Sequence, residues 1–206
     1  MKEELLKKCL NYDFEKLFKR KGYSYFTKGI YNLNIIAVRS DNNNKVTNEF
    51  DDVLVVIYNT QVKQNKRQAY FITTEPGLYY TKDKLFNSKG TSILVPDQYK
   101  STWKIGKHKG KYKALVQAKP VKVYRDANKD DIFDLLPQTI EQGIFGINIH
   151  RSNEFGESAK VNKWSAGCQV FKRVEDFKAF LLLCDKQAAL YENSFTYTLI
   201  NEEDLV

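Results

Sequence analysis

The feature that most constrains the fold is a series of short runs rich in β-branched and aromatic residues, separated by polar turns. The runs are LNIIAV (33–38), VLVVIYN (53–59), QAYFITT (68–74), SILV (92–95), YKALVQ (112–117), VKVYR (121–125), FGINIH (145–150) and FTYTLI (195–200). Strand-forming runs at such short intervals favour an antiparallel sandwich or a barrel-like sheet over alternating strands and helices. We therefore predict a mainly β, α+β fold.

Two segments instead show helical spacing. Apolar residues recur every three or four positions from Leu5 to Phe18, between lysines and glutamates, and predict one amphipathic helix that ends near Gly22. Residues 174–191 predict a single C-terminal helix. We expect residues 1–28 to form a helical extension that docks on a domain made by residues 29–206.

Composition limits the environment and the partners. No run approaches the roughly 18–20 apolar residues of a membrane-spanning helix, so no integral membrane segment is expected. The first residues lack the continuous apolar stretch of a secretory signal, and we expect synthesis in the cytoplasm. The net charge of +8 suits anionic partners, but no nucleic-acid recognition motif accompanies it. Charge alone therefore supports a nucleic-acid binder only weakly, and the oligomeric state is not indicated.

The two residue types most useful for nucleophilic chemistry are rare, and they come together in one segment. The chain has two histidines and three cysteines, and residues 146–173 hold His150 and Cys168. Histidine is the usual base that activates a cysteine thiol. Gly167 permits a tight turn before the sulfur, and we expect the backbone N–H groups of Gly167 and Cys168 to stabilise an oxyanion. Cys9 and Cys184 lie in Leu-rich helical stretches and are expected to be buried thiols.

The motifs IHRS (149–152) and SAGC (165–168) resemble the signature of the L,D-transpeptidase (YkuD-like) family. The resemblance implies that His150 is the general base, Cys168 the nucleophile, Ser165 the family's Ser/Thr position and Gly167 its turn. A backbone carbonyl near Arg151 or Ser152 would orient the base. It also implies a YkuD-like β-sandwich or mixed sheet, and peptidoglycan stem peptides as substrate. No cofactor is implied.

The motif departs from the family pattern beside the nucleophile. Ala166 stands where a second histidine is usual, Val170 where Arg or Asn is usual, and Arg151 where Gly or Ser is common. These losses favour hydrolysis over cross-linking at the cell wall or periplasm. We expect the substrate to contact Arg151, Ser152, Ala166 and Gln169, and a stem-peptide carboxylate to meet Arg39.

Several alternatives stay open. Segments 75–83, 90–99 and 103–112 are similar to a phage-borne branch of the superfamily, which favours a phage lysin. A wall-binding or virion structural protein with the same fold and no activity is the alternative, and an intracellular cysteine peptidase or transferase unrelated to walls is a third. His108 is expected in a solvated loop, or in a loop that contacts substrate.

No metal site is expected from the sequence. One further histidine and scattered cysteines cannot assemble a zinc site. Residues 126–134 resemble the start of a calcium-binding loop but lack its glycine and its final glutamate, so an acidic turn is preferred.

Overall fold

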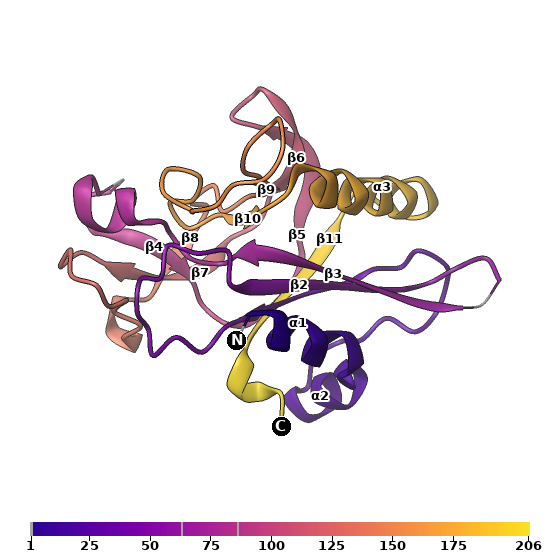
Figure 1. The fold of residues 1–206 in the computed structure, drawn as a ribbon. Coiled ribbons are helices and arrows are strands. Elements are labelled where there is room, and N and C mark those ends of the chain that lie inside the picture. The colour runs from indigo at the N-terminus through magenta and orange to yellow at the C-terminus, as the bar shows by residue number, and fades with distance from the viewer. Residues whose placement is uncertain (1, 63, 86) are drawn as a thin grey trace.

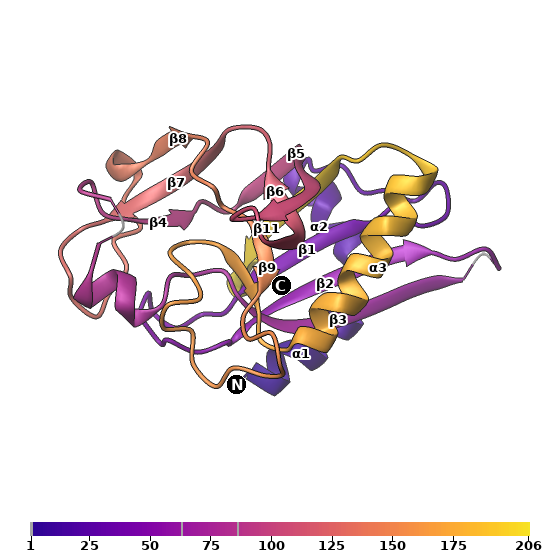
Figure 2. The ribbon, with the colours of Figure 1, turned by 90° about the horizontal axis from the view of Figure 1, so that it is seen from above.

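The structure, a computed structural model, describes residues 2–62, 64–85 and 87–206. Within these residues eight strands close into a barrel in the order β1-β11-β5-β6-β9-β10-β3-β2 (Figure 1). The barrel strands are β1 (Asn34–Arg39), β2 (Asp52–Asn59), β3 (Asn65–Thr73), β5 (Asp97–His108), β6 (Tyr112–Gln117), β9 (Ile149–Arg151), β10 (Gln169–Phe171) and β11 (Phe195–Asn201). A second sheet contains β4 (Thr91–Leu94), β7 (Val121–Asp126) and β8 (Glu141–Gly143). It lies beside the barrel at the end away from the C-terminal helix (Figure 2).

The barrel sheet is mixed. β1 pairs with β11 in parallel, as β9 does with β10, while the other barrel pairs are antiparallel. The predicted mainly β, mixed-sheet architecture is thereby confirmed. Of the predicted alternatives, a sandwich or a barrel-like sheet, the described residues form a closed barrel, in which the first and last strands pair with each other, Ile35 opposite Tyr197.

Helices cover two faces of the β1–β2 part of the sheet. β1 is buried at every position, so alternate residues serve two separate cores. Ile35 and Ala37 face a core that includes residues of the C-terminal helix α3 (Val174–Leu190). Ile36 and Val38 face a second core beneath the N-terminal helices. Figure 1 shows α3 and the N-terminal helices on opposite sides of the sheet.

The N-terminal segment contains two helices where one was predicted. α1 (Lys2–Asn11) and α2 (Phe14–Lys21) are separated at Asp13, whose carboxylate accepts the Lys16 N–H at 3.0 Å and caps α2. α2 ends at Gly22 in the left-handed conformation, as the sequence predicted. The predicted C-terminal helix is confirmed as α3. None of the helices in the described ranges is long and apolar enough to cross a bilayer.

The longest strand, β5, was not predicted. Lys100, Lys104 and Lys107 lie along it, and the remaining positions form no continuous apolar run. Its last residue is His108, which the sequence had placed in a loop. This strand and its hairpin to β6 bring His108 to the candidate site.

Candidate active site

A cavity of about 450 Å³ opens between the barrel and the small sheet. His108 of the β5–β6 hairpin, His150 of β9 and Cys168 before β10 all line it. Its wall also includes Asn148 and Ala166. The two residues that the sequence singled out therefore share one cavity.

The strand register places His150 and Cys168 on one face of the sheet. β9 and β10 are parallel, and Val170 lies opposite His150 and Gln169 opposite Ile149. Continuing this register by one residue places Cys168 beside Asn148. Side chains alternate along a strand, so Cys168, Asn148 and His150 lie on the same face. The loop between the two strands returns Cys168 to the strand that carries His150.

A backbone carbonyl defines the tautomer of His150. Its Nδ1 lies 2.7 Å from the carbonyl oxygen of Arg151, and because a carbonyl can only accept, Nδ1 carries the proton. Nε2 is then an unprotonated acceptor. The Tyr112 hydroxyl lies 3.2 Å from the same Nδ1.

Burial lowers the pKa of His150 to about 3, and the nearby His108 adds to that effect. The imidazole of His150 is therefore neutral near pH 7.

Cys168 is half-buried and rests as a thiol. Its Sγ donates to the carbonyl oxygen of Gly146 at 3.4 Å. Burial raises the pKa of this thiol, and the backbone N–H of Asn148 and the positive charge of Lys109 offset part of the rise. The cavity therefore contains a neutral thiol and a neutral imidazole at neutral pH.

Ser165 holds the turn that precedes the nucleophile. Its hydroxyl donates to the carbonyl oxygen of Cys168 at 2.8 Å and accepts the N–H of Gly167 at 3.1 Å. This corrects the expectation that the Gly167 N–H stabilises an oxyanion, because that donor is already used. The Cys168 N–H makes no hydrogen bond within the part of the chain that the structure describes.

Gly167 is required at this turn by conformation and by space. Its φ is +120°, and a Cβ atom would lie 2.3 Å from the backbone oxygen of Ser92 in β4. The turn therefore packs directly against the small sheet.

Of the expected substrate contacts beside the motif, only Ala166 lines the cavity. Ser152 and Gln169 are fully buried; the Ser152 hydroxyl donates to the Lys172 carbonyl, and the Gln169 side chain accepts from Tyr197. The expectation that these two touch substrate is therefore corrected. They hold neighbouring strands together instead.

The Arg151 side chain is also directed elsewhere. Its guanidinium pairs with Glu154 at 3.2 Å and lies over the Tyr112 ring at 4.2 Å. Arg151 contributes to the site through its backbone carbonyl, which the sequence had offered as one of two positions for that role.

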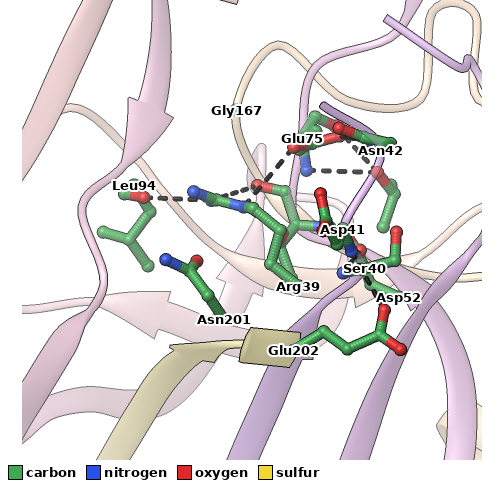
Figure 3. Close-up of polar contacts among 12 residues, drawn as sticks. Arg39, Ser40, Asp41, Asn42, Asp52, Glu75, Leu94, Gly167, Asn201 and Glu202 are labelled. Carbon is green, nitrogen blue, oxygen red and sulfur yellow. Dashed lines mark hydrogen bonds and ion pairs between the residues drawn. The ribbon is translucent and has the colours of Figure 1, made fainter. Parts of the chain in front are cut away.

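Arg39 belongs to a buried charge cluster outside the cavity (Figure 3). Its guanidinium donates to Thr74 Oγ1 and to the Leu94 carbonyl, each at 3.0 Å, and pairs with Glu75 at 3.5 Å. It is 4% exposed. The predicted substrate contact is corrected to a structural role, because the guanidinium is enclosed by protein groups.

The same cluster contains two buried carboxyl groups, Asp52 and Glu75, beside one guanidinium. Asp52 accepts backbone N–H groups from Ser40 at 2.8 Å and from Thr74 at 2.6 Å, which favours its ionised form. Burial and the charge of Asp52 raise the pKa of Glu75 to about 8. Burial also raises the pKa of Asp52, and its hydrogen bonds and the charge of Arg39 offset part of that rise. Glu75, with its pKa of about 8, holds a proton at neutral pH.

The rim of the cavity is cationic and aromatic. Lys109, Arg125 and Lys163 line it, with Trp164 and Tyr80, and no Asp or Glu is among its described lining residues. This rim could not be predicted from the sequence, because its residues come from segments far apart in the chain.

The structure assigns residues 126–134 to a turn held by its own side chains. The Asn128 amide donates to Asp130 and Asp134, each at 3.0 Å. Among the described residues no group of three or more His, Cys, Asp or Glu side chains is arranged to hold a metal ion.

Comparison with known proteins gives no relative: no family model, no curated protein and no solved structure matches the chain.

Proposed function

We propose that the protein is a cysteine-dependent acyl-transfer enzyme that acts on peptidoglycan stem peptides, as a peptidase more than as a transpeptidase. One observation carries the proposal. Cys168 shares a cavity with a neutral imidazole whose Nδ1–H is held by the Arg151 carbonyl, which leaves Nε2 of His150 available as a base. Thioester chemistry needs a neutral base of this kind in the same site as the thiol.

The proposed reaction begins with proton transfer from the thiol to Nε2 of His150 as Sγ attacks an amide carbonyl. A C–S bond forms, and the oxyanion accepts the Cys168 N–H. The imidazolium then gives its proton to the departing amine as the C–N bond breaks, which leaves a thioester and a neutral base. Water resolves the thioester to an acid, whereas an amine from a second stem peptide gives a cross-link.

The cavity suits a peptide that carries carboxylates. Its volume lies within the ordinary range for a ligand site, and Lys109 and Lys163 add positive charge without an acid among the described lining residues. Trp164 and Tyr80 offer flat apolar faces to the aliphatic parts of a peptide. We infer from these features and from the motif that the protein acts at a bacterial cell wall, in the manner of a phage lysin.

The test is mass spectrometry of purified muropeptides incubated with the wild-type protein and with Cys168→Ala. A matched control is Cys9→Ala, which removes a buried thiol far from the cavity. New fragments or cross-links from the wild type and the control, but not from Cys168→Ala, are expected. Fragment masses then separate hydrolysis from cross-linking. Muropeptides left intact by all three proteins would refute the proposal.

A wall-binding protein without activity is a second candidate, and the resting state of Cys168 favours it. The raised pKa of the thiol and its hydrogen bond to Gly146 are also compatible with a non-reactive cysteine. For a binder, Cys168→Ser should leave peptidoglycan binding unchanged in a sedimentation assay while no product forms with either protein.

A further inference from the structure

The two histidines of the chain lie face to face. The rings of His108 and His150 have centroids 3.9 Å apart and an angle of 28° between their planes. His108 is 6% exposed and ends β5, so its backbone is held by the strand. A buried stack of this kind restricts the rotation of both rings.

Asn148 fixes the tautomer of His108. The backbone N–H of Gln117 donates to Asn148 Oδ1 at 3.0 Å, which orients the amide so that Nδ2 is the atom 3.1 Å from His108 Nδ1. Since an amide nitrogen can only donate, His108 Nδ1 accepts, and the neutral ring carries its proton on Nε2. The two stacked rings therefore have opposite tautomers, Nε2–H in His108 and Nδ1–H in His150.

We propose that His108 is a positioning residue for the base: anchored by Asn148 and stacked on His150, it fixes the plane of the His150 ring and the direction of the Nε2 lone pair. The inference rests on the proposed function for its catalytic meaning. The ring geometry itself belongs to the folded protein and is measurable without substrate.

The groups around His150 support a neutral, fixed ring. Lys109 of the hairpin and Arg151 of β9 are cations that lower the pKa of both imidazoles, after the larger effect of burial. Tyr112 of β6 contacts His150, Cys168 lines the same cavity, and the pKa of each is raised. None of these groups offers a negative charge that would hold a proton on Nε2 at neutral pH, and Glu154 pairs with Arg151 instead.

The first test is the nitrogen NMR spectrum of the imidazoles, which is simple because the chain has two histidines. The expected spectrum shows one ring protonated at Nε2 and the other at Nδ1 at neutral pH. Asn148→Ala should release the His108 tautomer while His150 keeps Nδ1–H through the Arg151 carbonyl. Identical tautomers in both rings, or a His108 signal unchanged by Asn148→Ala, would overturn the inference.

The second test separates positioning from binding. His108→Ala should lower kcat on muropeptides by on the order of tenfold to a hundredfold with little change in KM, since a displaced base slows the chemical step. His108→Phe keeps a flat ring over His150 and should recover most of the lost rate, and circular dichroism confirms that both variants fold. A kcat for His108→Ala equal to that of the wild type would refute the positioning role. If the wild type shows no activity on muropeptides, the proposed function fails, and the NMR result still decides the ring geometry.

Discussion

Replacing Gly167 by alanine places a methyl group against the backbone of β4. The Cβ atom would lie 2.3 Å from the Ser92 oxygen and 3.1 Å from the Ser92 carbonyl carbon, whereas real Cβ atoms essentially never come within 3.0 Å of a heavy atom. Ser92 is paired with Arg125 of β7, so β4 cannot move alone. The turn that carries Cys168 has to shift instead, and its φ of +120° is strained for any residue with a side chain.

The magnitude follows from two separate penalties. Overpacking against a fixed backbone costs about 1–3 kcal/mol, and an unfavourable backbone conformation costs about 1–3 kcal/mol. We expect Gly167→Ala to lower the free energy of unfolding by about 4 kcal/mol, a large part of the total stability of a domain. The control is Gly110→Ala, at a φ of +71° with nothing within 4 Å, for which about 1–2 kcal/mol is expected.

Urea unfolding of both variants measures the difference, read as a change in midpoint at constant slope. Alkylation of Cys168 in the folded proteins reports whether the turn has moved: Gly110→Ala should keep the wild-type rate, and Gly167→Ala should change it. If the two substitutions cost the same free energy, the contact between the turn and β4 does not constrain the site, and the reasoning fails.

Three other properties can be checked. The pKa of Glu75 in the folded protein, about 8, exceeds its ordinary value of 4.5, so the folded state retains a proton that the unfolded chain loses, and the free energy of unfolding falls as pH rises through that window. We therefore expect the unfolding free energy of Glu75→Gln, relative to that of the wild type, to be higher at pH 8 than at pH 4.5 by on the order of 3 kcal/mol in urea titrations. Equal pH dependences of the two proteins would contradict the raised pKa of Glu75. Arg39→Met removes the cation that lies beside the buried carboxyl groups of Asp52 and Glu75 and should cost about 3 kcal/mol, while the alkylation rate of Cys168 stays at the wild-type value. A folded variant with an altered rate would place Arg39 in the site. Because the pKa of Cys168 is raised above 9.0, its alkylation by iodoacetamide should still be accelerating at pH 9, with the same profile in His150→Asn; a plateau at neutral pH would show a thiolate–imidazolium pair instead.

Two of the predicted strands, β1 and β2, are apolar on both faces. β1 and β2 are covered by helices on one side and by the barrel core on the other, so their sequences are continuous apolar runs. β5 carries exposed lysines between buried residues, and neither a continuous apolar run nor a two-residue alternation marks it in the sequence. Because β5 was not predicted, His108 was assigned to a loop, and no neighbouring strand could be predicted for it.

Contacts between residues close together in the motif could be predicted from the sequence, whereas contacts with distant strands could not. A carbonyl beside the base was expected at Arg151 or Ser152, and the structure uses Arg151. The burial of Gln169 and Arg39 depends on strands distant in the chain, to which no local pattern refers. The division of the N-terminal helix was missed although it could have been predicted locally. Asp13 precedes a new apolar turn, and an aspartate in that position is a helix-capping signal.

The parallel pairing of β1 with β11 has a consequence for biosynthesis. β1 is among the first strands to leave the ribosome, and its partner along one edge, β11, is nearly the last. α1 and α2 can cover the outer face of β1 early, but the edge itself stays unpaired until β11 arrives. Because contacts between distant segments form slowly, we expect closure of the barrel to follow translation, with the open edge of β1 as the surface most in need of a chaperone until then.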